Sequence, residues 1–552
     1  MTVTVSTGSR RRGTGVSPAQ RGMWLADRMH PDSGMNNVFC LVRLVGTLDP
    51  EALRGAIADV VARHSALRST FHDEDGTPVV RVADAVDVSL PVVEPSVSAE
   101  RTRRLAQEWC ERPFDLAAGP LVRTRLVRIR PREHLLCIAV HHIVCDGQSL
   151  AVLFGELSAA YATRTGAAVT AELPALSAQY GEYVAWRAAH VTPPVDWWAS
   201  YLDGVPDLLP LPADRVRPPV RGGAGDTVVF DIPEQLADDL ATLARRHRMS
   251  PFMVLLAVYG VVLGRLSDVR DLVVGIPVTD RPLPEFEPLI GMFVDTLPVR
   301  LTMPPGVTFA DLLADVRRSV LGVLSHQHVS FDALVDLCGA NRSPAHTPLV
   351  QAAFGADVAP FPAPVLSEVD VEVCTPLPTG AKFDLDVWFN APSDGRGGLV
   401  GALTYSTELF ERATADALAE RFVHLLGAAV AEPSRRVDAL PLTGPDERRT
   451  ILERWGRGGP ARSKELPVHE MFAQHAALAP DAPAVSAEGR ELSYRELDAR
   501  RRQIAGRLRR TGLGPDDVVG ILHERDADMV AALLGILSAG AAYLPLSSTH
   551  PP

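Results

Sequence analysis

One run of the sequence, from His134 to Val140 (HLLCIAV), is apolar at nearly every position. Successive side chains of a β-strand point to opposite faces, so a strand that is apolar at both parities is buried on both faces. We therefore expect a central strand with a packed layer on each side, which favours folds in which helices cover a sheet. The strand runs into two histidines, His141 and His142, and an Asp146-Gly147 pair follows.

The rest of the chain mixes strands and helices in the same style. At 552 residues the chain is too long for one compact core, because domains usually contain ~100–200 residues. Strand patterns recur in DLVVGIPV and LVGALTYSTELF, and helical patterns in SPFMVLLAVYGVVLGRLS and TFADLLADVRRSVLGVLSH. We predict an α/β protein with one lobe over residues 1–190, a second over 191–440, a linker over 441–465 and a third, short unit over 466–552.

Two helix starts carry capping signals. Asp49 followed by Pro50 predicts the start of a helix that places Leu53 and Ile57 on one face. After the histidines, the segment SLAVLFGELSAAYATR has helical spacing, and we expect Ser149 to cap that helix.

Composition excludes several classes of function. A net charge of −12 and an isoelectric point near 5.8 argue against nucleic-acid binding, which requires a basic surface. No run approaches the ~18 apolar residues that span a membrane. The six cysteines lack metal-ligand or disulfide spacing, which fits a reducing cytoplasm, and we expect Cys145 to be a packed side chain. Lysine occurs only at Lys382 and Lys464, which we interpret as coding bias.

The histidine pair suits acid–base chemistry better than metal binding. Neighbouring residues of a strand face opposite sides, so His141 and His142 cannot converge on one ion, and a catalytic zinc site needs three protein ligands. We predict no metal. An imidazole at a strand end can accept a proton near neutral pH, and such a base contributes ~10²–10⁴-fold to a rate. His142 is the better candidate, and His141 would support the fold.

Asp146 has two possible roles. It could orient a histidine, as in a hydrolase-like triad, or it could be structural. A carboxylate near the core needs a cation, because an unpaired buried charge is costly, and Arg281 from the second half is a plausible partner. Gly147 would then permit backbone angles, or a close approach, that a side chain forbids.

Six segments, in order, resemble the motifs of the condensation domains of nonribosomal peptide synthetases. The resemblance extends from about Ser17 to residue 440. Ser65 stands where the family usually has Glu, and Asp295 where it usually has Asn. The segments are SPAQRGMW, RHSALRSTF, VHHIVCDGQS, YGEYVAW, IGMFVDTLPVR and HQHVSFD.

The resemblance implies a fold and a reaction. The fold would be two chloramphenicol-acetyltransferase-like lobes in a V-shaped pseudo-dimer, with the site between them. By similarity His142 is catalytic, His141 is its structural neighbour, and Asp146, beside Gly147, pairs with Arg281. The reaction would join thioester-bound aminoacyl or peptidyl groups into an amide during secondary metabolite or antibiotic biosynthesis. Donor and acceptor peptidyl carrier proteins would present these groups on 4'-phosphopantetheine, and the chain itself would bind no cofactor. Whether His142 acts as a base or positions the amine stays open.

The tail resembles the start of an adenylation domain, through LSYREL and LSAGAAYLPL, although Ser547 departs from the usual Asp. The family's glycine-rich phosphate loop does not follow, so we expect a partial α/β adenylation subdomain that does not activate amino acids by itself.

Other members of this superfamily fit less well. Epimerization domains carry an EGHGR-like motif that is not seen, and heterocyclization domains replace the histidines with aspartates. An acyltransferase that uses a soluble amine or alcohol is the enzymatic alternative. The non-enzymatic alternative is an inactive scaffold that recruits another enzyme, but such members generally have a degraded catalytic motif.

Overall fold

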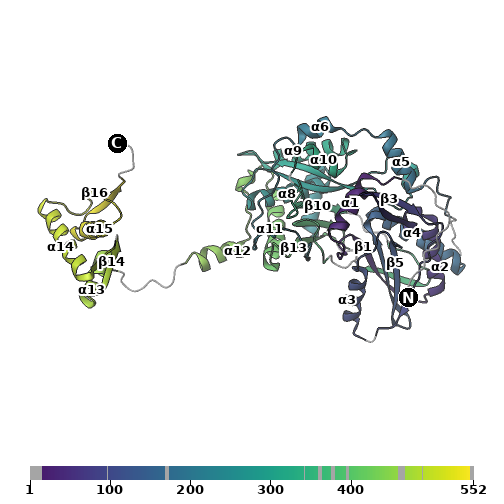
Figure 1. Ribbon diagram of the computed structural model, residues 1–552, viewed down its shortest axis with the longest axis horizontal. Coiled ribbons are helices and arrows are strands. Elements are labelled where there is room, and N and C mark those ends of the chain that lie inside the picture. The colour runs from purple at the N-terminus through teal and green to yellow at the C-terminus, as the bar shows by residue number, and fades with distance from the viewer. Residues whose placement is uncertain are drawn as a thin grey trace. The chain divides into compact units, whose positions relative to one another are not determined.

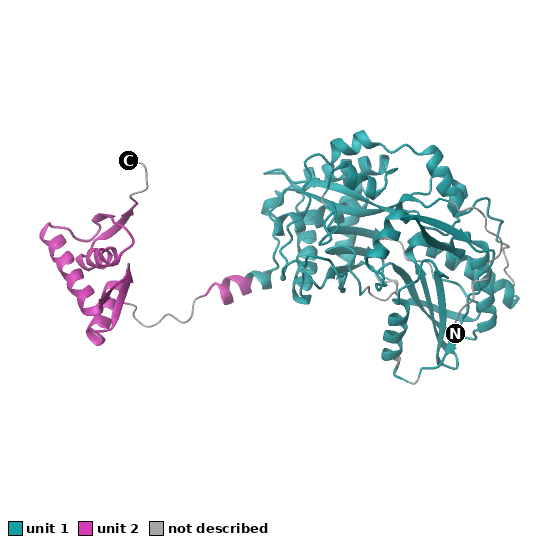
Figure 2. Ribbon diagram, viewed as in Figure 1, with its two compact units in different colours: residues 1–448 teal, residues 449–552 magenta. Residues whose placement is uncertain are grey.

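A computed structural model of the chain describes residues 15–95, 97–167, 173–340, 342–357, 363–374, 379–392, 397–457, 466–487 and 489–547 (Figure 1). The chain divides into two compact units, Met1–Arg448 and Arg449–Pro552 (Figure 2). The predicted lobe boundary at residue 190 and the predicted linker over 441–465 stay predictions.

The first sheet of unit 1 has the strand order β11-β1-β6-β5-β4. Its central strand, β6, contains the apolar run, and every residue of β6 after Glu133 is buried. Leu136 and Ile138 face a core shared with α2 and α4, whereas Leu135 and Cys137 face a smaller core with α3. Figure 1 shows α3 on one side of β1 and β5, and α2 and α4 on the other. The predicted central strand is therefore confirmed.

The elements of this part are β1 (Asn37–Gly46), α2 (Pro50–Arg63), β4 (Val92–Val93), α3 (Ala99–Cys110), β5 (Val122–Arg130), β6 (Glu133–His141), α4 (Gly147–Thr165) and β11 (Val369–Cys374). The predicted Asp49 cap of α2 is confirmed, because the Asp49 carboxylate accepts from the backbone N–H groups of Glu51 and Ala52. β11 comes from the later half of the chain and pairs antiparallel with β1, with Leu44 opposite Val371. The sequence did not predict this exchange.

The second sheet of unit 1 has the order β7-β13-β12-β10-β8-β9. A large apolar cluster on this sheet includes most of α8 and the inner faces of α9 and α11. The predicted strands and helices of this half are confirmed. Their bounds are β7 (Gly225–Ile232), α7 (Glu234–Arg246), α8 (Pro251–Leu266), β8 (Asp271–Thr279), β9 (Val294–Thr302), α9 (Phe309–Ser325), β10 (Ala352–Asp357), β12 (Leu385–Asn390), β13 (Leu399–Ser406) and α11 (Arg412–Ala431).

Shorter elements connect and cover the two sheets of unit 1. β2 and β3 form a separate hairpin. These elements are α1 (Pro18–Met29), η1 (Ser65–Arg68), β2 (Ser69–Glu74), β3 (Thr77–Val82), η2 (His142–Val144), α5 (Tyr180–His190), α6 (Val195–Tyr201), η3 (Pro284–Phe286), α10 (Phe331–Leu337) and η4 (Val437–Ala439).

The segment 441–465, predicted as a linker, contains helical turns in its described part, α12 (Pro445–Arg449) and the π-helix η5 (Thr450–Trp455). Unit 2 then pairs β14 with β15 antiparallel and β16 with β17 parallel. Its elements are α13 (Val468–Leu478), β14 (Pro483–Ala487), β15 (Arg490–Ser493), α14 (Tyr494–Arg510), β16 (Val518–Leu522), α15 (Ala527–Ala539) and β17 (Ala542–Leu546).

Among the described helices, none by itself is long and apolar enough to cross a membrane, whereas α7 and α8 meet the length and composition criteria only as a pair with a 104° bend between them.

Candidate active site

The site begins where β6 ends. His141 is the last residue of the strand, and its N–H donates to the Leu121 carbonyl at 2.9 Å. His142 opens the 3-10 helix η2, and its N–H donates to the Asn36 carbonyl at 2.8 Å, just before β1 begins. The two histidines are therefore held by main-chain bonds to the segments on either side of β6.

His141 is buried and has partners on both ring nitrogens. The Ile143 N–H donates to Nδ1 at 3.2 Å, and Nε2 lies 3.2 Å from Asp27 Oδ1 in α1. Because Nδ1 accepts a hydrogen bond, the ring proton lies on Nε2 and is donated to Asp27. Phe114 packs edge-on against the ring. These contacts tie α1 to the end of β6. Asp27 was not predicted, because nothing in the sequence relates α1 to this strand.

His142 is only partly buried, and the surroundings of its ring differ from those of the His141 ring. Its Nδ1 atom is buried and makes no hydrogen bond within the described residues. Burial, followed by the charge of Lys382, lowers the pKa of His142 to about 3. The imidazole is therefore neutral at neutral pH, and it can accept a hydrogen bond.

Asp146 joins the two sheets of unit 1. The carboxylate is buried, and its Oδ1 accepts from the Ser149 N–H at 2.8 Å, the Ser149 hydroxyl at 2.7 Å and Arg281 Nη2 at 3.2 Å. Its Oδ2 accepts from the Phe293 N–H at 2.9 Å. Asp146 is thus the N-cap of α4, and the expectation that Ser149 caps this helix is wrong. The helix starts one turn earlier than the apolar spacing indicated, and Ser149 is a donor to the true cap.

Arg281 reaches Asp146 from the segment between β8 and β9. Its Nη1 donates to the carbonyls of Phe286 and Leu289, each at 2.8 Å, and its guanidinium lies 3.8 Å from the centre of the Phe293 ring. Neither histidine ring is among the hydrogen-bond partners of Asp146 in the described part of the chain. This geometry favours the structural alternative for Asp146 over the triad-like one. The roles of both residues stay predictions.

Gly147 is the first residue of α4 and is exposed. Its φ is not positive, and an added Cβ would meet no described atom within 4 Å. The expectation that Gly147 supplies special backbone angles is therefore wrong, and no described residue approaches it closely, whereas its role in the site stays a prediction. A residue at a helix start has ordinary helical φ, so a side chain fits there without strain.

The sequence indicates only coding bias for Lys382, but its charge acts on the His142 ring. Lys382 precedes β12 of the second sheet, whereas His142 follows β6 of the first sheet. The charge of Lys382 is the second largest cause of the lowered His142 pKa. One signal in the sequence could have found it: Lys382 is the only lysine before residue 464.

Asp295, which stands where the resemblance expects Asn, has an unusual environment in β9. The Thr296 N–H donates to its Oδ1 at 2.9 Å, whereas its Oδ2 is buried without a hydrogen bond from any described residue. Burial raises the pKa of Asp295 to about 7, against a weaker opposing effect of Thr296 and Arg187. The group is therefore poised to titrate near neutral pH.

Two further features border the site. Cys145 is fully buried, and burial raises its thiol pKa, so the thiolate is disfavoured. The described residues contain no group of three His, Cys, Asp or Glu side chains placed to hold a metal ion.

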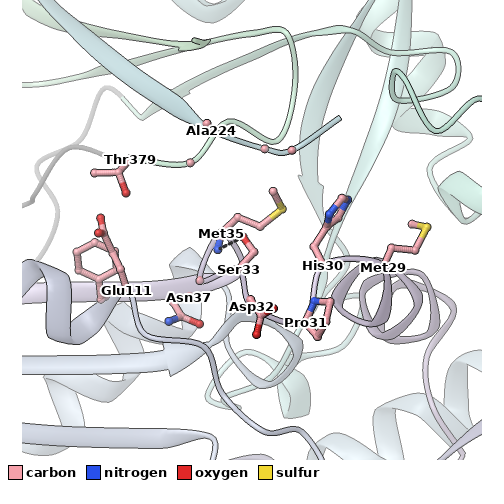
Figure 3. Close-up of a pocket in the computed structure, with 15 residues that line it drawn as sticks. Met29, His30, Pro31, Asp32, Ser33, Met35, Asn37, Glu111, Ala224 and Thr379 are labelled. Atoms are coloured by element: carbon pink, nitrogen blue, oxygen red, sulfur yellow. Dashed lines mark hydrogen bonds between the residues drawn. The ribbon is translucent and has the colours of Figure 1, made fainter. Parts of the chain in front are cut away.

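A pocket of about 590 Å³ lies beside this end of β6. It is lined by the loop between α1 and β1 and by residues 222–224 and 379–380, and Figure 3 shows Ala224 and Thr379 opposite that loop. His142 does not line it, but Asn37 does, and Asn37 pairs with His141.

Comparison with known proteins shows which families the chain resembles. The family model of the condensation domain matches residues 12–452, and that of AMP-binding enzymes matches residues 472–552. A linear gramicidin synthase of Brevibacillus parabrevis is 35% identical over 558 residues, which cover 98% of this chain and 11% of that protein. Phosphinothricin tripeptide synthetase PhsC of Streptomyces viridochromogenes is 34% identical over 556 residues, which cover 97% of this chain and 50% of that protein. The chain thus spans from about a tenth to a half of these relatives.

Solved structures show the same fold. A four-domain nonribosomal peptide synthetase, holo-AB3403 bound to AMP and glycine, matches with a TM-score of 0.80 and 23% identity over 99% of this chain and 42% of its own. The X-domain from teicoplanin biosynthesis matches with a TM-score of 0.71 and 28% identity over 79% of this chain and 99% of its own. The predicted α/β fold, with a partial adenylation segment at the C-terminal end, is confirmed. The chain belongs to the condensation domain family of nonribosomal peptide synthetases.

Proposed function

We propose that unit 1 joins two carrier-bound thioesters through an amide bond, as expected for a condensation domain. The observation that carries this proposal is the placement of His142. It is a neutral, partly exposed imidazole directly after the central strand, four residues before Asp146, whose pair with Arg281 links the two sheets.

The reaction needs a neutral amine aligned with a thioester. An α-ammonium has a pKa of ~7.7–8.0, so much of the acceptor amine is protonated at neutral pH. Moving that proton to an imidazole of pKa about 3 would cost about 7 kcal/mol, since one pKa unit corresponds to ~1.36 kcal/mol. We therefore assign His142 a positioning role, in which the neutral ring accepts a hydrogen bond from the neutral amine.

The bond changes then balance without a net proton on His142. The nitrogen lone pair attacks the donor carbonyl carbon, the C–N bond forms, and the carbonyl electron pair moves to oxygen. When the C=O bond re-forms, the C–S bond breaks, and the proton lost by nitrogen ends on the departing thiolate. Correct orientation of the two reactants can contribute ~7–11 kcal/mol to such a step.

The partners follow from this chemistry. Donor and acceptor carrier proteins would bring the acyl groups on 4'-phosphopantetheine arms, and the chain itself would bind no cofactor during condensation. We place the reaction in the cytoplasm, where carrier proteins and their activated substrates are made.

Mass spectrometry of the acceptor carrier tests the proposal. The full chain is incubated with a charged donor carrier and a charged acceptor carrier, and the acceptor should gain the mass of the donor acyl group. His142→Ala should lose this product by about 10²-fold or more, because a misplaced amine reacts that much more slowly. His190→Ala is the matched control, because His190 is an exposed histidine of α5. Product with a free amine but none with a carrier-bound amine would instead identify an acyltransferase for soluble acceptors.

One comparison favours a second candidate, a recruitment platform. The X-domain from teicoplanin biosynthesis has been solved in complex with OxyB, and that chain is 27% identical to this one over 80% of this chain and 99% of its own length. If this chain acts in that way, the purified full chain and its His142→Ala variant would bind OxyB equally well, and neither would form product.

A further inference from the structure

Lys382 is unusual first for what it is. The chain has 55 lysine and arginine residues, and 53 of them are arginine, so arginine serves wherever a positive charge is enough. The ammonium group is compact and can approach a single oxygen atom, whereas the planar guanidinium is larger and presents a fork of donors. Lys382 is the only lysine among the described residues, so it supplies a compact ammonium group where the rest of unit 1 uses arginine.

A series of contacts brings the segment that precedes Lys382 close to the backbone that binds His142. The Asn36 carbonyl that binds the His142 N–H is preceded by Met35. Met35 lies between two glycine segments, since a Cβ added to Gly223 would lie 2.3 Å from Met35 Cε, and one added to Gly380 would lie 3.2 Å from Met35 Cβ. Figure 3 shows Met35 below Ala224. Lys382 follows Gly380 by two residues.

The backbone around Lys382 is fixed on both sides. The Ala381 N–H donates to the Gly223 carbonyl at 3.0 Å, and Arg221 Nη2 donates to the Ala381 carbonyl at 2.9 Å. Two residues later, the buried Asp384 is held by both terminal nitrogens of Arg217. The backbone that carries Lys382 is thus held in place, as the precise placement of a functional side chain requires.

The Lys382 side chain itself has no fixed partner. It is partly buried, and its ammonium makes no hydrogen bond or ion pair with any described residue. Two ionisable groups interact with its charge, Asp386 in β12 and His142 in η2. Burial lowers the pKa of Lys382 to about 8, opposed by Asp386, and burial raises the pKa of Asp386 to about 6. A partly exposed, unpaired ammonium beside the candidate catalytic histidine is available to a substrate.

We propose that Lys382 is a further catalytic residue, whose ammonium donates a hydrogen bond to the donor carbonyl oxygen while His142 holds the attacking amine. The inference rests on the proposed function. When the amine forms the C–N bond, the electron pair of the carbonyl moves to oxygen, and this negative charge develops beside the ammonium. When the C–S bond breaks, the charge leaves with the sulfur, so Lys382 neither gains nor loses a proton.

The kinetic test compares variants at Lys382. Removal of one oxyanion donor lowers kcat by ~10²–10³-fold in other enzymes, and we expect the same range for Lys382→Met. Lys382→Arg should recover only part of this loss, because the guanidinium is larger. Lys464→Arg, the change at the only other lysine, should keep wild-type activity. A Lys382→Met or Lys382→Gln variant that is folded by circular dichroism and is within twofold of wild type would overturn the proposal.

A second test does not depend on peptide synthesis. In the Lys464→Arg chain, Lys382 is the only lysine, so its acetylation by acetic anhydride can be followed on one peptide by mass spectrometry. We expect the labelling rate to rise with a midpoint near pH 8, and a lower midpoint in Asp386→Asn, because Asp386 favours the charged ammonium. A donor carrier with its acyl group in a stable amide linkage should slow the labelling.

The two tests separate the two proposals. If wild type makes no peptide but the donor carrier protects Lys382, the proposed reaction fails while the contact of Lys382 with the donor stands. If labelling has the ordinary midpoint near 10.5 and the donor carrier does not slow it, the inference about Lys382 is refuted, whatever the activity of the chain.

Discussion

Replacing Arg281 with methionine should destabilise unit 1 far more than the same change at an exposed ion pair. The Arg281 and Asp146 side chains are each 2% exposed, so the substitution leaves a buried carboxylate without its cation. Breaking such a pair costs ~3–5 kcal/mol. The carbonyls of Phe286 and Leu289 lose their donors in addition, so we expect the upper end of this range.

The matched control is Arg164→Met. Arg164 makes two hydrogen bonds of 2.7 Å to Asp59, closer than the 3.2 Å contact of Arg281 with Asp146, but these side chains are 41% and 49% exposed. Exposed ion pairs contribute ~0–1 kcal/mol because water screens them. If contact distance decided the loss of stability, Arg164→Met would lose more than Arg281→Met. If burial decides it, Arg281→Met loses more.

The assay is urea unfolding of the full chain by tryptophan fluorescence, combined with hydrogen exchange read by mass spectrometry. Exchange should accelerate at the amides of Ser149 and Phe293, which donate to Asp146. The double variant Arg281→Met, Asp146→Asn should recover part of the lost stability, because no unpaired charge remains. Equal losses for Arg281→Met and Arg164→Met, or a double variant no more stable than Arg281→Met, would refute the reasoning.

Three further predictions concern single residues. Asp295→Asn should stabilise the chain above pH 7 by up to about 4 kcal/mol in urea unfolding and should have little effect near pH 4. The pKa of Asp295 is raised from 3.8 to about 7, so the native protein loses stability as the pH rises through this window, and an amide does not titrate. Equal effects at both pH values would contradict this prediction. The pH profile of kcat should lack an inflection near 6.5, since the His142 pKa of about 3 lies below the assayed range. The His142→Ala variant should have a lower plateau of kcat, and the midpoint set by the acceptor amine should not move. Gly147→Ala should change the unfolding free energy by less than ~1 kcal/mol, because the added methyl group meets open space; a larger loss in the melting curve would show that the helix start needs glycine.

Local patterns in the sequence predicted the parts of the fold that depend on local physics. The run through Val140 is apolar at both parities, and it is the central strand buried on both faces. The Asp49 cap was predicted because a helix start is decided by a few neighbouring residues. His142 was singled out because it follows this strand, and the structure places it at the strand end.

Most of the remaining features depend on contacts between distant segments. Nothing in β1 indicates that Val369–Cys374 completes its edge, because a half-buried alternating strand can pair with any other. The Asp27–His141 contact joins residues 114 positions apart. Asp146 and Ser149 are both good cap residues three positions apart, and only the backbone decides between them.

The exchange of β11 between the two halves of unit 1 bears on the engineering of these synthetases. A chimera that takes only residues 1–190 from one enzyme would meet a foreign strand along Leu41–Gly46, where six residues of β1 pair with β11. A fragment ending at residue 190 would instead expose that edge, and an unpaired strand edge invites aggregation. Recombination that transplants residues 369–374 together with the first half should therefore yield more folded protein than a cut in the connecting loop alone.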